Sequence, residues 1–347
     1  MYIKRILWAV ALIGLVIFAV IAYYIYGAMF SPNTKFESEK VYVHIATDDN
    51  YTLVRQQLDS LLEDMDTFDA LARRKKYISN VKPGRFIIEK GMNNNEIINS
   101  IRSRNIPLQV SFNNQNSLEV LAGRIGEQIE ADSLSLLGAM NNSDFLKNNG
   151  FNKQTALGMY LPNSYEFFWN TDAKGFRDRM LKEYHRFWND SRLKKAEAID
   201  MTPNEVITMA SIVYEETKQK SEQPRVAGVY FNRIRIGMPL QADPTIRFAA
   251  YQLPEYKNTI IKRVLNKHKE INSPYNTYTN RGLPPGPIAM PDLSAIDAVL
   301  NYENHNYLYF VADAERLGFH KFAKTLSQHN ANARRYHNYL NQQGILR

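Results

Sequence analysis

The chain has 347 residues, of which 44% are hydrophobic and 22% are charged. This length predicts more than one domain, and this composition is typical of folded proteins, so a largely disordered chain is excluded. The chain contains no cysteine. Disulfide frameworks, thiolate zinc sites, iron–sulfur clusters and cysteine nucleophiles are therefore excluded. The formal net charge of +8 permits nucleic acid, anionic lipid or an acidic polymer as a partner.

Residues 6–30 carry no charged side chain. As a helix they would reach roughly 37 Å, more than the roughly 30 Å hydrocarbon core of a bilayer. Lys4 and Arg5 precede this run and the next charge is Lys35, so residues 1–5 are expected in the cytoplasm and the rest outside. A cleaved signal peptide is the alternative, but its apolar region typically has only about 7–15 residues. The run favours an uncleaved single-span anchor, and the resulting topology argues against nucleic acid as the partner.

A polar tether at 31–40 follows the anchor. Apolar residues then alternate as in a half-buried strand or repeat at helical spacing. The elements predicted up to residue 110 are a strand, a helix, a second strand and a short helix, at 41–45, 54–65, 85–89 and 97–101. Together they indicate a small α/β unit over 41–110.

Residues 111–200 read as a mostly helical connecting region. Its aromatic stretch at 160–169 is interpreted as core, with stacking on sugar rings as the alternative. From residue 201 onward we expect a helix, a Gly/Pro/Asn-rich region, a strand at 307–312 and a last helix. The predicted fold class is α+β, with the larger mixed domain at 201–347.

A helix start is encoded at Thr202, because a Thr N-cap, Pro203 and a glutamate three residues after the cap form a capping box. Two adjacent carboxylates lie further along this helix, and helical spacing separates their faces. Glu215 shares its face with Ser211 and Thr208, whereas Glu216 shares its face with the apolar residues Val213, Ile212 and Met209. Glu215 should therefore face water, and Glu216 should face the interior or a cleft.

A carboxyl group on an apolar face should have a raised pKa, as a general acid near neutral pH requires. The alternative is a structural ion pair of Glu216 with Arg225 or Arg233. No GxSxG, P-loop, GxGxxG or HExxH motif occurs in the sequence. We therefore expect no metal site and no cofactor.

Several longer segments carry a resemblance to a known family. They are KPGRFIIEKGMNNNEIINSI (82–101), LPNSYEF (161–167), MASIVYEET (209–217), VAGVYFNRIRIGMPLQADPTI (226–246), SPYNTYTNRGLPPGPIAMP (273–291), YLYFVAD (307–313), His320, Phe322 and SQHN (327–330). These segments resemble the YceG-like family, whose characterised members are membrane-anchored endolytic murein transglycosylases of the MltG type. The family's catalytic glutamate matches Glu216. This sequence departs from the family pattern at Tyr214 and Glu215.

The resemblance implies a LysM-like glycan-binding unit at 41–110 and a catalytic domain at 201–347. It also implies cleavage of the β-1,4 bond between N-acetylmuramic acid and N-acetylglucosamine in nascent glycan strands, leaving 1,6-anhydro ends and ending strand elongation. The implied partners are peptidoglycan strands and the cell (inner) membrane, and the resemblance allows peptidoglycan synthases as well. A non-catalytic, membrane-anchored wall-binding scaffold is the alternative.

The matched segments also supply candidates for substrate binding around Glu216. The structural alternatives are a helix cap for Asp243, helix packing for Asn232, and pinning of a Pro/Gly-rich loop for Asn276 and Tyr278. The candidates are Asn232, Gln241, Asp243, Thr245, Asn276, Tyr278 and His320.

Overall fold

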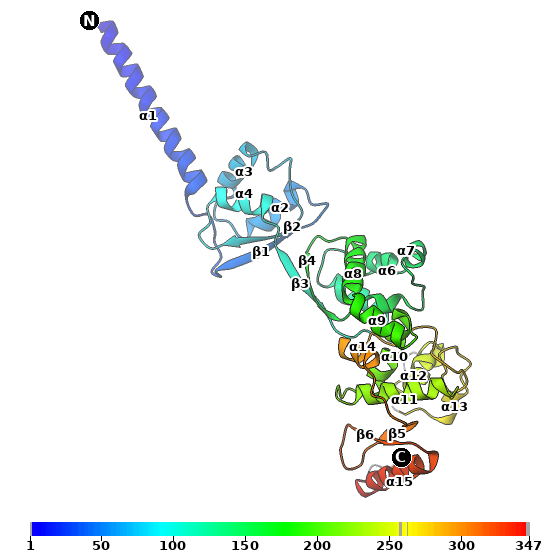
Figure 1. Ribbon diagram of the computed structural model, residues 1–347. Coiled ribbons are helices and arrows are strands. Elements are labelled where there is room, and N and C mark those ends of the chain that lie inside the picture. Colours follow the sequence, from blue (N-terminus) through cyan, green and yellow to red (C-terminus); the bar gives the residue numbers. More distant parts are fainter. Residues whose placement is uncertain (1, 257–258, 262, 345–347) are drawn as a thin grey trace. The chain divides into compact units, whose positions relative to one another are not determined.

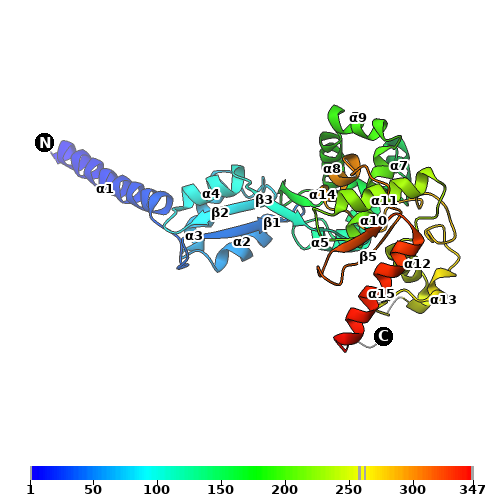
Figure 2. The same ribbon diagram turned by 60° about the horizontal axis from the view of Figure 1, so that its bottom comes forward.

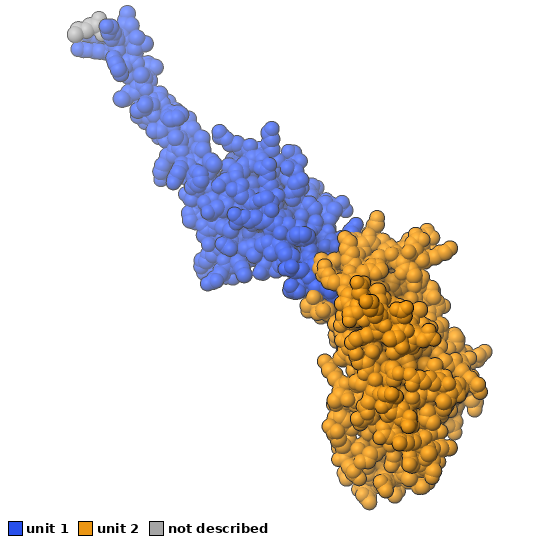
Figure 3. Space-filling view, in the orientation of Figure 1, with its two compact units in different colours: residues 1–110, 128–131, 165–172 blue, residues 111–127, 132–164, 173–347 orange. Residues whose placement is uncertain are grey.

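The structure, a computed structural model, describes residues 2–256, 259–261 and 263–344. The chain divides into two compact units, coloured separately in Figure 3. Unit 1 comprises residues 1–110, 128–131 and 165–172. Unit 2 comprises residues 111–127, 132–164 and 173–347, and therefore includes chain on both sides of residue 200.

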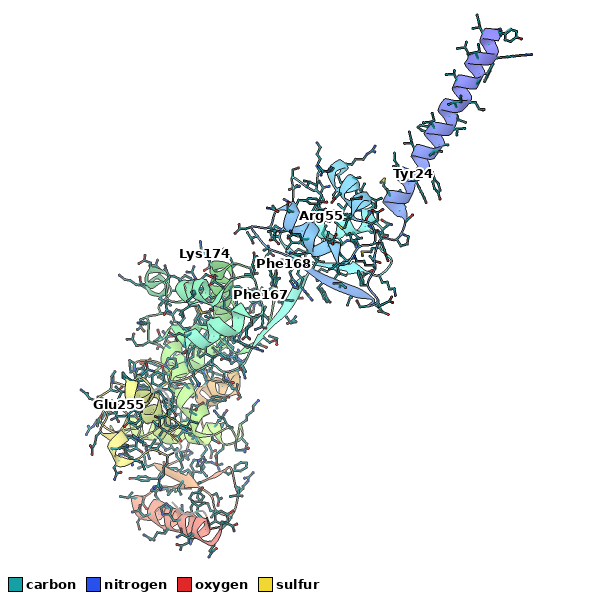
Figure 4. All side chains as sticks on the ribbon, turned by 180° about the vertical axis from the view of Figure 1, so that it is seen from behind. Tyr24, Arg55, Phe167, Phe168, Lys174 and Glu255 are labelled. Atoms are coloured by element: carbon teal, nitrogen blue, oxygen red, sulfur yellow. The ribbon has the colours of Figure 1, made fainter. Side chains whose placement is uncertain are left out.

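The N-terminal helix α1 (Tyr2–Phe30) is the one helix in the described ranges that is long and apolar enough to cross a membrane. A stretch of 18 residues within it has a mean hydropathy of 2.7, and none of its residues is buried. Tyr24, labelled in Figure 4, lies near the end of α1 that leads into the rest of unit 1. These properties are consistent with the predicted membrane anchor.

Unit 1 continues with β1 (Lys40–Ile45), α2 (Tyr51–Asp59), α3 (Met65–Arg74), β2 (Gly84–Glu89) and α4 (Asn94–Ser103) (Figures 1 and 2). The two strands pair antiparallel, from Lys40 opposite Glu89 to Ile45 opposite Gly84. The sequence predicted a single helix between these strands. The structure has two, because the Asp64 side chain accepts the backbone N–H groups of Asp66 and Thr67 and so begins a new helix.

The segment expected as a tether is partly packed onto unit 1. Asn33 is buried, and its side chain donates to the backbone carbonyl of Asp64 at 2.8 Å and accepts from the Asp64 N–H at 2.7 Å. Asn94, also buried, donates to the carbonyl of Ala28 in α1 at 2.8 Å. Met29 packs against the hydrophobic core of the unit. The end of α1 and the residues after it are therefore joined to the folded unit.

Strands β3 (Pro107–Phe112) and β4 (Asn163–Phe168) pair with each other. In β4, Tyr165 and Phe167 are buried while Phe168 is half exposed, the alternation of a strand with one covered face. Figure 4 labels Phe167 and Phe168. Tyr160 is fully buried, so the aromatic stretch belongs mainly to the core, as the sequence indicated.

Unit 2 is mostly helical. Its helices are α5 (Leu118–Gly126), α6 (Ser133–Met140), α7 (Ser143–Asn148), α8 (Ala173–Phe187), α9 (Asp190–Ala198), α10 (Pro203–Glu216), α11 (Gln223–Arg235), α12 (Asp243–Tyr251), α13 (Asn266–Lys269), α14 (Leu293–Leu300) and α15 (Leu326–Gln342), with 3-10 turns η1 (Ala156–Met159) and η2 (Pro254–Tyr256). The sequence predicted one strand near the C-terminus. The structure has an antiparallel pair, β5 (Tyr309–Ala312) and β6 (His320–Ala323), against which α15 packs (Figure 2).

The centre of unit 2 is α10, which packs against α11, α12 and α14. Every residue from Val206 to Val213 is buried, and the predicted capping box at Thr202 is present. Helix α11 approaches the chain after α14 very closely: a Cβ on Gly228 would lie 2.3 Å from the carbonyl oxygen of Glu303. Only glycine allows this approach of α11 to the chain after α14.

Candidate active site

A pocket of about 390 Å³ opens in unit 2 at the C-terminal end of α10. Its walls come from α10, α11, the start of α12, the loop before α14, the β5–β6 pair and α15. Its lining residues are Glu216, Tyr230, Arg233, Gln241, Asp243, Tyr278, Tyr309, Phe310, Val311, Ala312, His320, Leu326 and His329. The lining combines aromatic rings and hydrogen-bonding side chains with two carboxyl groups, those of Glu216 and Asp243, as in pockets that bind polar ligands.

Glu216 is the last residue of α10, and its half-buried side chain faces this pocket. Its Oε1 accepts a hydrogen bond from the hydroxyl of Tyr230, on α11, at 2.7 Å. Tyr230 is itself buried, which holds its hydroxyl in place. The end of one helix and the middle of the next therefore determine where the carboxyl group of Glu216 lies.

The pKa of Glu216 is raised to about 7. The main cause is burial, which disfavours the charged carboxylate, and the negative charge of Asp243 acts in the same direction. The hydrogen bond from Tyr230 opposes this effect, and so do the nearby side chains of His320 and Arg247. A carboxyl group with this pKa can donate a proton near neutral pH and accept one later.

The two arginines considered as structural partners of Glu216 bind other groups. Arg225 pairs with Glu303 at 3.0 Å, and Arg233 donates to the backbone carbonyl of Leu308 at 2.7 Å. In the described part of the chain, no ion pair joins either arginine to Glu216. The geometry therefore does not support the structural ion pair.

The neighbouring Glu215 has a different environment. Its side chain is 31% exposed and accepts from Lys218, which lies three residues later and past the end of α10, at 2.9 Å. The two glutamates are about 100° apart around the helix, which is why one faces the pocket beside Tyr230 and the other pairs with a surface lysine.

Four of the seven predicted binding candidates line the same pocket as Glu216: Gln241, Asp243, Tyr278 and His320. The Tyr278 hydroxyl donates to Asp243 at 2.6 Å, so these two side chains hold each other. Gln241 has a φ of 47°, a backbone conformation that is uncommon outside glycine and often found at binding sites.

The other three candidates lie behind the pocket wall. Thr245 is fully buried and donates to the carbonyl of Ala242 at 2.7 Å. Asn276, also fully buried, donates to the carbonyls of Lys269, the last residue of α13, and of Ile271. Asn232 donates to the carbonyls of His305 and Tyr307. In this structure they hold the loop and α11 in position.

Several lining residues were not candidates from the sequence. Tyr230, Tyr309, Phe310 and His329 reach the pocket from α11, β5 and α15. Tyr230 lies 14 positions after Glu216 on a separate helix, so helical periodicity does not relate them. Its place in the matched segment 226–246, two residues before Asn232, was the one available signal.

Comparisons with known proteins agree with this architecture. The YceG-like family profile matches residues 43–335. A protein of Bacillus subtilis (strain 168) named endolytic murein transglycosylase is 30% identical over 280 residues, which are 75% of this chain and 74% of that protein. A protein of the same name from Streptococcus pneumoniae (serotype 2, strain D39) is 32% identical over 179 residues, which are 50% of this chain and only 31% of that longer protein.

A crystal structure of a yceG-like protein from Listeria monocytogenes superposes with a TM-score of 0.56 at 26% sequence identity. The match covers 85% of this chain and 99% of that chain. The profile match and the Bacillus relative both extend over most of this sequence. The chain described here therefore belongs to the YceG-like family.

Proposed function

We propose that this protein is a lytic transglycosylase that cleaves peptidoglycan glycan strands internally, with Glu216 as its acid and base. One observation carries the proposal: the carboxyl group of Glu216, with a pKa near 7, lies in a pocket with sugar-sized space and hydrogen-bonding walls. The names of the Bacillus and Streptococcus relatives support the same activity.

The proposed reaction needs one carboxyl group in two steps. Protonated Glu216 gives its proton to the glycosidic oxygen, and the bond from that oxygen to C1 of N-acetylmuramic acid breaks. The sugar's own N-acetyl group helps to stabilise the positive charge that develops at C1. The Glu216 carboxylate then takes the proton of the C6 hydroxyl, and O6 bonds to C1. The product is a 1,6-anhydro end, and Glu216 is protonated again.

The remaining proposals concern the rest of the chain. Helix α1 would span the inner membrane with residues 1–5 in the cytoplasm, since Lys4 and Arg5 flank its N-terminal side. Cleavage close to that membrane would end elongation of new strands. The proposed domain bounds are those of the sequence analysis.

We further propose that residues 41–110 are a LysM-like unit that binds glycan. The order strand, two helices, strand, with the strands antiparallel, supports this. Deleting residues 1–105 should then raise KM more than it lowers kcat. A collapse of kcat at unchanged KM, in a protein whose unit 2 still melts cooperatively, would contradict it.

The test of the catalytic proposal is the pair Glu216→Gln and Glu215→Gln. The amide keeps the size of the acid but can neither give nor take the proton, so Glu216→Gln should lose at least about 10⁴-fold in kcat, the upper end for general acid–base catalysis. Glu215→Gln removes the neighbouring charge and should retain most activity. Near wild-type cleavage by Glu216→Gln, in protein of unchanged melting temperature, would remove Glu216 from the mechanism.

The product distinguishes this reaction from hydrolysis. Asp243 places a second carboxyl group in the pocket. Most hydrolytic glycosidases use two carboxyl groups in catalysis. Mass spectrometry of digested glycan strands should find anhydro ends, one water lighter than reducing ends. Reducing ends would favour hydrolysis, and no cleavage by the wild type would favour the wall-binding scaffold.

A further inference from the structure

Glu222 is a buried carboxyl group with no part in the reaction described above. It lies just before α11, its side chain is only 5% exposed, and it is six residues after Glu216. Burying a carboxylate is costly unless its oxygens accept hydrogen bonds. The donors that surround it therefore indicate what it does.

Three donors converge on this carboxylate, and two of them belong to His320. The backbone N–H of His320 donates to Oε1 at 2.8 Å, and ring nitrogen Nδ1 lies 2.8 Å from Oε2. The hydroxyl of Thr217, the residue directly after Glu216, donates to Oε2 at 3.3 Å. One side chain thus connects the end of α10 with the first residue of β6.

The contact with Nδ1 determines where His320 carries its proton. An ionised carboxylate can only accept, so Nδ1 is the protonated nitrogen. In the neutral ring, Nε2 is then a hydrogen-bond acceptor. Among the described residues Nε2 has no hydrogen-bond partner, and the ring lines the pocket that contains Glu216.

We propose that Glu222 is a positioning residue that acts through His320, holding the ring in its Nδ1–H form so that Nε2 accepts a hydrogen bond from a hydroxyl group of the bound glycan. This inference rests on the proposed glycan-cleaving function. It gives β6, which has no other polar side chain in the pocket, a direct part in binding the sugar beside Glu216.

Glu222→Gln tests this with little change of shape. The amide oxygen can still accept the backbone N–H of His320, but the amide nitrogen donates to Nδ1, so the ring proton should move to Nε2. Nε2 would then meet the sugar hydroxyl as a donor. We expect kcat/KM to fall roughly 10- to 100-fold, the range for an unsatisfied buried polar group. The matched control is Glu315→Gln, an exposed carboxyl group that pairs with Lys321 next to His320 and should leave kcat/KM unchanged.

The tautomer itself can be measured by ¹⁵N magic-angle-spinning NMR on the full chain labelled at its 7 histidines, with His320→Gln to assign the signal. The wild type should show a protonated Nδ1 on His320, and Glu222→Gln a protonated Nε2. In Glu216→Gln, which cannot turn over, added glycan fragments should shift the Nε2 resonance of His320. This last readout does not depend on cleavage, so it separates failure of this inference from failure of the proposed reaction.

Two results would overturn the inference. One is a Glu222→Gln protein with wild-type kcat/KM, and the other is an Nε2 resonance of His320 that does not shift when glycan binds. Should Glu222→Gln fail to fold, His320→Ala decides instead. Recovery of its activity by added imidazole supports a ring nitrogen acting at the substrate. A folded His320→Ala protein that is fully active, or that imidazole does not rescue, means that Glu222 and His320 only fasten β6 to α11.

Discussion

Glu216 and Tyr230 form a pair in which burial and hydrogen bonding act in opposite directions. Burial raises the pKa of Glu216 because it disfavours the carboxylate, and the Tyr230 hydroxyl lowers the pKa because it donates to that carboxylate. The pKa of the carboxyl group that we propose as the acid is thereby kept close to neutral pH, so that the group can both give and regain a proton.

Tyr230→Phe should separate these two effects. Without the hydroxyl, the pKa of Glu216 rises further, so the basic limb of the pH–rate profile should move to higher pH. The phenyl ring preserves the packing against Phe310. Tyr302→Phe, which removes a hydroxyl bonded to Arg235 outside the pocket, is the control. A basic limb that stays in place, or moves down, would show that this limb does not report Glu216.

The raised pKa also affects stability. The pKa of Glu216 is about 7 in the folded protein, against an ordinary value of 4.5. Between pH 4.5 and pH 7, Glu216 is therefore more fully protonated in the folded protein than in the unfolded chain. The contribution to the free energy of unfolding is fully present below pH 4.5 and is lost as the pH rises through about 7. The upper limit of this contribution is on the order of 3 kcal/mol. Because the carboxyl group faces an open pocket, solvent screening makes the contribution smaller than that limit.

Glu216→Gln removes this dependence. Between pH 5 and pH 8 the wild type should therefore lose unfolding free energy relative to the variant, as measured by urea denaturation followed through Trp188, which is buried in unit 2. Parallel stability curves for the two proteins across this range would mean that Glu216 has an ordinary pKa.

At the scale of elements, the pocket depends on how closely α11 can approach its neighbours. Asn232 ties α11 to the chain at His305, and Gly228 permits the approach. Because Tyr230 lies on the same helix, a small displacement of α11 would move its hydroxyl away from Glu216.

Gly228→Ala should therefore lower both stability and activity. The added methyl group would overlap the carbonyl of Glu303, and such overpacking typically costs about 1–3 kcal/mol. Gly138→Ala is the matched control, because its Cβ meets nothing within 4 Å in the middle of α6 and should stabilise by roughly 0.5–1 kcal/mol. Calorimetry and kcat on both variants check this. A Gly228→Ala protein as stable and active as the wild type would contradict the close approach.

At the scale of the whole molecule, helix α1 and the folded part of unit 1 do not separate at residue 30. Ala28 and Met29 of α1, and Asn33 after it, contact the core of unit 1. A soluble form should therefore begin at residue 28, not after residue 30.

Deleting residues 1–27 should give a soluble protein in which unit 1 melts as in the full chain. Deleting residues 1–36 also removes Asn33 and leaves the buried Asn94 without two partners, at a cost of roughly 1–3 kcal/mol for each unsatisfied group. Its melting temperature should be lower. Equal melting temperatures for the two truncations would show that this segment contributes nothing to folding.

The sequence by itself determined features whose signals are local. The length and hydropathy of residues 6–30 predicted a helix long and apolar enough to span a membrane, and Thr202 with Glu205 predicted where α10 begins. Helical spacing placed Glu216 and Glu215 on different faces, and Glu216 faces the pocket. These predictions succeed because the period of a helix and the hydrogen bonds of its cap depend only on residues within a few positions of one another.

Only the tertiary structure decided which distant groups meet at Glu216. Thr245 and Asn276 belong to matched segments like Tyr278, yet they are fully buried behind the wall, because which side of a loop faces solvent depends on what packs against it. Glu222 and His320 are 98 positions apart and come together through the β5–β6 pair and the position of α11. No local period relates such residues, since their contact is set by the packing of the whole unit.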